Sequence, residues 1–143
     1  MKRLLLVACF ALLASSPATA RASVLDPPPL LQGEKALALF SVSGVVTAGG
    51  LGTYFSCTST STVPIRVSVE VFNETPGSTI NDPSAVSVSV APGNTVMFAT
   101  QNESASFCSA QLLTPSPVFL PLGSARILST SKSLVCTAFL ADA

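Results

Sequence analysis

The chain has 143 residues, a formal net charge of zero and no histidine or tryptophan. Because histidine is absent, the sequence excludes His-dependent acid–base catalysis, Ser-His-Asp and Cys-His nucleophilic sites, and nearly all zinc and copper enzymes, including cupredoxins. The seven Lys and Arg residues are scattered, so the basic cluster of a nucleic-acid-binding or polybasic membrane-binding surface is missing. We therefore expect no nucleic-acid partner, no cofactor and a single domain of ordinary size.

The first twenty residues have the pattern of a secretory signal peptide. Basic Lys2 and Arg3 precede an apolar signal helix, Leu4–Leu13, and the small residues Ala18-Thr19-Ala20 form a cleavage site. Cleavage after Ala20 would place the mature protein in the periplasm or outside the cell.

Two alternatives for this segment are weaker. A membrane anchor needs about 20 apolar residues, and Ser15-Ser16-Pro17 interrupts the run. Lipidation at Cys9, within Leu6-Val7-Ala8-Cys9, would leave only a stub of apolar sequence before the modified residue. We expect no membrane segment once the signal peptide is removed.

Residues 21–34 (RASVLDPPPLLQGE) are proline-rich. Three consecutive prolines favour a stiff extended segment without donors for a sheet ladder. This stretch is predicted to be a spacer or an edge wrap, and residues 35–143 are predicted to form the domain.

The domain begins with a predicted strand and turn. Residues 40–47 are rich in β-branched side chains, and Gly44 suits a bulge. Gly49-Gly50-Leu51-Gly52 indicates a hairpin turn. A phosphate-binding loop is disfavoured there because a strand follows and no lysine does.

The stretch from Thr53 to Asn73 is predicted to form two adjacent strands that nucleate the sheet. A short strand through Phe55 and Cys57 is followed by a polar turn and by strict alternation from residue 65 onward. One face of that second strand carries Ile65, Val67, Val69 and Val71, which predicts core positions.

Five further strands complete the predicted sheet after a long loop over residues 74–84. Residues 86–90 and 95–100 flank Ala91-Pro92-Gly93-Asn94 and indicate a second hairpin, and residues 107–113 a short strand. Residues 125–129 and 134–141 indicate a final hairpin. Its last strand is apolar on both faces, which predicts a position inside a sheet.

Seven to eight short strands predict an all-β, two-sheet antiparallel sandwich. The order of features in FSCTSTSTVPIRVSVEVF and VSVSVAPGNTVMFAT resembles bacterial immunoglobulin-like domains. The resemblance covers residues 35–143 as architecture and implies an immunoglobulin-like sandwich, although the core tryptophan of true immunoglobulin domains is absent.

Cys57, Cys108 and Cys136 remain after the predicted cleavage. Cysteines in an oxidising compartment tend to pair, and three pairings are open. Cys57 and Cys136 each share strand parity with apolar neighbours, which favours a bond between them and leaves Cys108 as a thiol.

The outward face of the central strand is the candidate contact face. It comprises Arg66, Ser68, Glu70 and Phe72. Such a polar face suits a partner protein or a polysaccharide, and Glu70 is expected to be a solvated charge beside Arg66.

The loop that follows is the other candidate region. Glu74 and Asp82, with Asn73 and Asn81, could hold calcium, but their spacing favours ordinary turns. Asn73 and Asn102 begin glycosylation sequons, which matter only in a host that modifies secreted chains.

No paired catalytic motif accompanies these residues. We therefore predict an exported, non-enzymatic structural or binding module. The alternatives are a subunit of an extracellular fibre or coat assembled through strand edges, and, more remotely, a small hydrolase that uses carboxylates alone.

Overall fold

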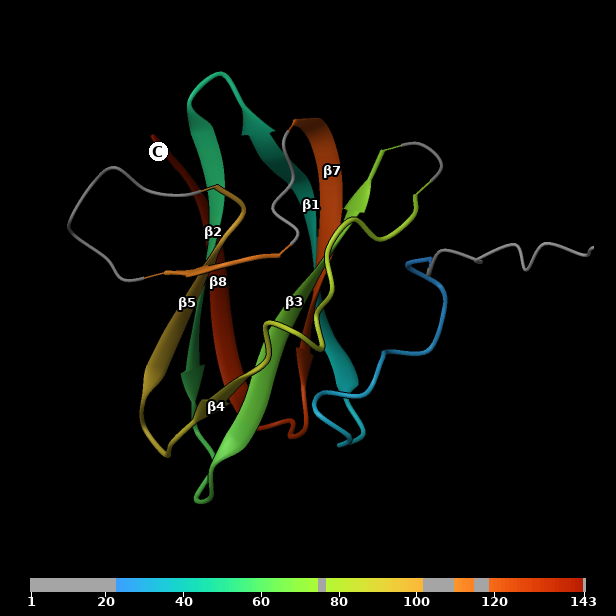
Figure 1. Cartoon of the computed structure of the whole chain (residues 1–143). Coiled ribbons are helices and arrows are strands. Elements are labelled where there is room, and N and C mark those ends of the chain that lie inside the picture. Colours follow the sequence, from blue (N-terminus) through green and yellow to red (C-terminus); the bar gives the residue numbers. More distant parts are fainter. Residues whose placement is uncertain (1–22, 75–76, 102–109, 115–118, 143) are drawn as a thin grey trace, which may run out of the picture.

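The computed structural model describes residues 23–74, 77–101, 110–114 and 119–142. In these residues the chain forms eight β-strands and no helix (Figure 1). The strands are β1 (Leu37–Ala48), β2 (Leu51–Ser59), β3 (Ile65–Asn73), β4 (Val88–Val90), β5 (Thr95–Ala99), β6 (Gln111–Leu112), β7 (Leu120–Ser129) and β8 (Leu134–Asp142). The predicted signal peptide, Cys108 and the sequon at Asn102 lie outside this part of the chain.

The strands form one mixed, curled sheet with two arms. Hydrogen bonding runs in the order β4-β3-β7-β1 through the first arm, named here the β3 arm. The second, the β2 arm, consists of β8, β2, β5 and β6. Neighbouring strands are antiparallel except for β5 and β6, which are parallel.

The arms are joined where β1 and β2 meet in a tight hairpin. Gly49 and Gly50 have φ angles of 62° and 82°, the left-handed conformation that this two-residue turn requires at both positions. Only two residue pairs then connect β1 with β2, whereas β7 pairs along most of β1. The predicted hairpin turn is confirmed, and β1 leaves β2 soon after it.

Thr53 and Thr100 bond to the backbone of β1 where it separates from β2. Because β8 occupies one edge of β2 throughout, β1 and β5 share the other edge in succession. At the junction the Val46 N–H donates to Thr53 Oγ1 (2.8 Å), and Thr100 Oγ1 donates to the Val46 carbonyl (3.0 Å). The side-chain hydroxyls replace the strand bonds that β1 has lost.

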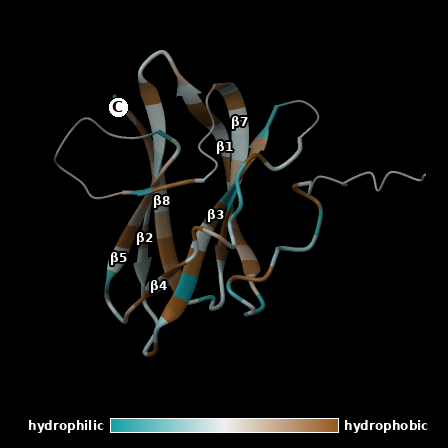
Figure 2. Cartoon of the chain, in the orientation of Figure 1, coloured by the Kyte–Doolittle hydropathy of each residue, from teal (hydrophilic) through white to brown (hydrophobic). Residues whose placement is uncertain are grey.

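The hydrophobic core lies between the two arms. Hydrophobic and polar positions alternate along the strands (Figure 2), and the apolar side chains of both arms form one cluster. The four predicted core residues of β3 are all buried in it, together with Phe55, Phe98, Ile127 and Leu134. This part of the sequence prediction is confirmed.

Three predicted strand pairings are wrong. β2 and β3 were expected to pair, as were β4 with β5 and β7 with β8, but the members of each pair belong to different arms. The turns between them cross from one arm to the other over the end of the core. Turn residues specify a chain reversal, but they do not specify whether the returning strand bonds to its predecessor or packs across from it.

The position predicted for the last strand is also wrong. β8 pairs with β2 alone among the described strands, so it is an edge strand and not an interior one. Its outward residues Val135 and Phe139 are 61% and 39% exposed. An apolar pattern on both faces therefore does not indicate burial here.

The proline-rich segment lies against the outer face of the β3 arm. Figure 1 shows its described part, in blue, on the side of β3 and β7 that faces away from β2 and β5. Leu31 is completely buried and forms a small second core with Ala36 and Leu128 of β7. The segment therefore covers a sheet face rather than acting as a free spacer.

Candidate functional site

The predicted contact face is largely inside the fold. Ser68, Glu70 and Phe72 are at most 1% exposed, so the expectation that they face solvent is wrong. Ser68 Oγ donates to the carbonyl of Pro83 at 2.7 Å, so the loop after β3 covers this position. Arg66 remains partly exposed and forms an ion pair with Glu34 at 2.9 Å.

Glu70 and Phe72 surround a buried arginine that the sequence analysis missed. Arg126 of β7 lies directly opposite Glu70 in the β3–β7 register, and its Nε donates to Glu70 Oε2 at 2.6 Å. The guanidinium carbon lies 5.3 Å from the centre of the Phe72 ring. Adjacent residues of a strand point to opposite faces, so in the segment ARILS Arg126 must lie on the face opposite to Ile127. This alternation was the signal that could have placed Arg126 on the covered face.

This ion pair also anchors the N-terminal segment. Arg126 Nη1 donates to the carbonyl oxygens of Val24 (3.1 Å) and Asp26 (2.6 Å). A charge withdrawn from water requires such partners, because an unpaired buried charge costs several kcal/mol. The predicted contact face thus binds residues 23–36 of the same chain.

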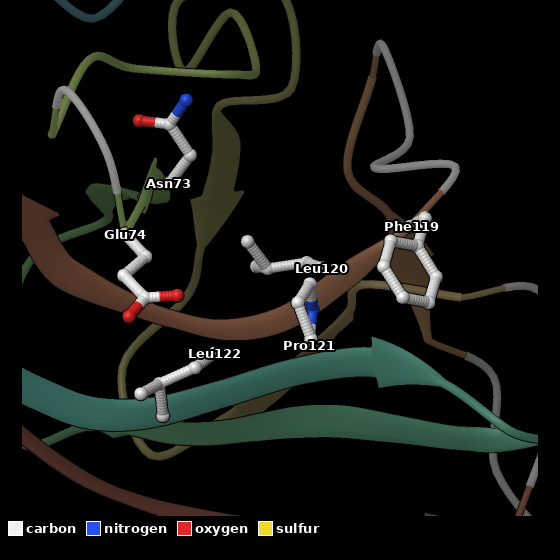
Figure 3. A pocket seen from close by; sticks show the side chains of 6 residues that line it. All are labelled: Asn73, Glu74, Phe119, Leu120, Pro121 and Leu122. Atoms are coloured by element: carbon white, nitrogen blue, oxygen red, sulfur yellow. The ribbon is translucent and has the colours of Figure 1, made fainter.

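Two hollows lie at the C-terminal end of β3, beside the start of β7. The first hollow has a volume of about 210 Å³, and Figure 3 shows the residues around it. The lining consists of Asn73, Glu74, Phe119, Leu120, Pro121 and Leu122. An adjoining hollow of about 320 Å³ shares Asn73, Glu74 and Leu122 and continues over β1 at Ser43 and Gly44.

Two glycines shape the second hollow. Gly44 has a φ of 73° and lies at a register shift between β1 and β7, which confirms the predicted bulge. A Cβ on Gly123 would lie 2.6 Å from the Phe72 carbonyl oxygen, so only glycine lets β7 approach β3 this closely. The bulge and the close approach leave the surface concave between them.

The two hollows contain one carboxylate and several apolar side chains. Glu74 is the sole ionisable residue in either lining, so neither hollow holds the two carboxylates that a glycosidase uses. Phe119 and Leu122 are 70% and 49% exposed. Sequence analysis missed both, because they follow prolines in a stretch without a strand pattern.

In the loop after β3, the side chain of Asn81 bonds to the backbone of β3 and that of Asp82 to the loop itself. Asn81 Oδ1 accepts from the Val71 N–H at 2.7 Å, and its Nδ2 donates to the Val69 carbonyl at 2.8 Å. Asp82 Oδ1 accepts from the N–H groups of Ser84 and Ala85. The turn interpretation is confirmed, and the described residues contain no group of three or more potential metal-ligating side chains of His, Cys, Asp or Glu.

The predicted disulfide is confirmed. Cys57 of β2 and Cys136 of β8 are bonded and lie directly opposite each other, with their Cα atoms 4.2 Å apart. The bond therefore joins neighbouring strands of the β2 arm. It closes a large part of the chain, since the two cysteines are 79 residues apart.

The free edge of β8 is the second exposed feature of the molecule. Leu140 is 52% exposed, and Phe139 stacks on Tyr54 of β2 with ring centres 5.5 Å apart. Nine consecutive residues pair with β2 without a register shift. The strand is therefore regularly paired, and its other edge has no strand partner within the described ranges.

The described part of the chain contains no helix long and apolar enough to cross a membrane. Comparison with known protein families, curated proteins and solved structures finds no match. A function must therefore be inferred from the fold, the hollows at the end of β3 and the free edge of β8.

Proposed function

We propose that this chain is an exported, non-enzymatic β-domain that acts as a structural or binding module in the periplasm or outside the cell. The observation that carries this proposal is the Cys57–Cys136 disulfide, because such bonds persist in oxidising compartments and are rare in the cytosol. The signal-peptide pattern of residues 1–20 points to the same location.

Within this proposal the curled sheet is an immunoglobulin-like sandwich whose two arms are its layers. A core that draws side chains from both arms supports it. The disulfide departs from the immunoglobulin pattern, because it joins neighbours within one arm instead of bridging the two sheets. The resemblance therefore concerns architecture and not the arrangement of the cysteines.

The carboxylates support a role without catalysis. Glu34 and Glu70 are in ion pairs with arginines, Asp82 caps a turn, and Glu74 is alone in its hollow. A carboxylate-only hydrolase, the remote alternative, needs two such groups facing one substrate. Phe119, Leu122 and Glu74 instead suit contact with a partner protein or a polysaccharide.

Export can be tested directly on the full chain. When it is produced in a bacterium with a working secretion system, we expect a periplasmic or secreted product that begins at Arg21. Its intact mass should be two hydrogens below that of the reduced form, because one disulfide has formed. A variant without residues 2–20 is the control and should stay in the cytoplasm. Recovery of the full-length chain in the cytoplasm with every cysteine reduced would contradict the proposal.

A second function, assembly into a fibre or coat through strand edges, is favoured by the β8 edge. Long, regular, apolar edge strands are templates for pairing with another chain. The edge is exposed, uncharged from Leu134 to Ala141, and nine residues long.

A further inference from the structure

The strands that end the sheet differ in how well they are protected against pairing. β4 and β6 have three and two residues, too short to template another strand. The edge of β1 is interrupted by three register shifts and by Gly44 in a left-handed conformation. β8 has none of these features.

The backbone groups on the free edge of β8 can be assigned from its pairing with β2. The Cys57 and Cys136 Cα atoms are 4.2 Å apart, the spacing of a non-hydrogen-bonded antiparallel pair. The N–H and C=O groups of Cys136 therefore point away from β2, and by alternation so do those of Ala138 and Leu140. Val135, Thr137 and Phe139 direct theirs toward β2.

We propose that β8 pairs antiparallel with β8 of a second copy of this chain, across a two-fold axis at Ala138. This inference rests on the strand-edge pairing proposed above and limits it to a closed pair of copies instead of a fibre. Leu134 N–H is already bonded to the Lys132 carbonyl, so Cys136, Ala138 and Leu140 are the central free positions. Pairing Ala138 with its copy, and Cys136 with the copy's Leu140, makes about six hydrogen bonds.

Self-pairing also suits the charges and side chains of β8. Asp142 is the one charged residue of the strand, and in this register it lies opposite Leu134 of the copy. The two Asp142 carboxylates would be roughly 27 Å apart at the strand rise, well beyond the screening length of about 8 to 10 Å. On the outer face each Phe139 would lie opposite Thr137, and each Val135 opposite Ala141.

A closed pair of copies would explain why β8 has exposed apolar side chains. Val135, Phe139 and Leu140 are 61%, 39% and 52% exposed in the single chain, and the second strand would lie beside all three and cover the side of each that borders the free edge. A two-fold arrangement uses each β8 edge once and leaves no further edge of this kind, so assembly stops at two copies.

Analytical ultracentrifugation of the exported product tests this pairing. We expect a concentration-dependent dimer between about 1 µM and 1 mM. Ala138→Pro should raise the dissociation constant at least about 100-fold, because proline removes the N–H at the two-fold axis and puts its ring on the free edge. Its bonds to β2 are unaffected, because Ala138 N–H does not point there.

A second variant covers the case in which proline unfolds the strand. Thr137→Lys leaves the backbone intact and places two like charges across the axis, so we expect at least about tenfold weaker association. Thr62→Lys, on an exposed turn residue away from β8, is the matched control and should dimerise like the wild type. Far-UV circular dichroism would verify that each variant is folded.

Amide hydrogen exchange would show which residues of β8 pair with the second copy. In the dimer, the amides of Ala138 and Leu140 should gain protection as the concentration rises, whereas those of Thr137 and Phe139 should be protected throughout. A wild type that stays monomeric over the whole range would overturn the pairing, as would a dimer that persists in both folded variants. Open-ended polymers would also overturn it. None of these results would contradict export, which depends on the location and mass of the product.

Discussion

The outer face of β3 and β7 and the free edge of β8 differ in what covers them. The first carries Arg66 and the buried Glu70–Arg126 pair, and it is covered by the loop after β3 and by residues 23–36, which are held by the guanidinium of Arg126. The second is almost uncharged and remains exposed. Polar residues are thus buried and apolar residues exposed, the reverse of the usual arrangement.

The difference shows that composition alone does not indicate which surface is available. Arg126 and Glu70 form an ion pair because strand register places them opposite one another, and the backbone carbonyls of residues 24 and 26 accept from Nη1. β8 is exposed because no other described strand continues the sheet beyond it. An interaction surface should therefore be sought at β8 and beside Glu74.

The largest effect is expected from breaking the buried ion pair. Arg126→Ala leaves the Glu70 carboxylate buried without its partner, so we expect a loss of about 3 to 5 kcal/mol in the free energy of unfolding. Arg66→Ala removes a largely exposed pair and should cost at most about 1 kcal/mol. Urea unfolding of both variants gives the comparison, and equal losses would show that burial of the pair is unimportant.

The disulfide in the β2 arm should have the next largest effect. Cys57→Ala/Cys136→Ala removes the constraint that the bond places on the unfolded chain, and we expect a loss of about 2 to 4 kcal/mol. Reduction of the wild type should produce a loss of similar size. A change below about 1 kcal/mol in urea unfolding would mean that strand pairing alone holds β8 in place.

The covering segment is tested by two adjacent leucines. Leu31 is completely buried, whereas Leu30 is 55% exposed. Leu31→Ala should cost about 2 to 3 kcal/mol because it leaves a cavity against Leu128, and Leu30→Ala at most about 0.5 kcal/mol. Thermal or urea unfolding would measure both, and a small effect of Leu31→Ala would mean that the segment is not part of the cooperative fold.

The smallest effect is expected on the outer face of β8. Val135→Thr should change the unfolding free energy of the dilute protein by less than about 0.5 kcal/mol. Val67→Thr buries a hydroxyl in the core and should cost about 1 to 3 kcal/mol. If the two substitutions have the same effect, Val135 is not a surface residue in the monomer.

Local features of the molecule could be predicted from the sequence. The alternation at residues 65–71 predicted the buried valines because side chains in a strand alternate between its faces. Strand parity favoured the Cys57–Cys136 bond. Two glycines at positions 49 and 50 predicted a turn that only a left-handed backbone can make. Each of these inferences depends on neighbours along the chain.

The strand pairings and the exposure of each face were decided only by the tertiary structure. The sequence correctly predicts three turns, but each of these turns connects strands of different arms. The pairing could not be predicted, because the energy of a turn hardly depends on which strand the next segment bonds to. Alternation places Phe72 on the same face of β3 whether that face is exposed to solvent or covered by another part of the chain. The sequence by itself thus predicted the approximate strand and turn segments and favoured the Cys57–Cys136 bond among three possible pairings. The partners and coverings depend on contacts between residues far apart in the chain, such as Glu70 and Arg126.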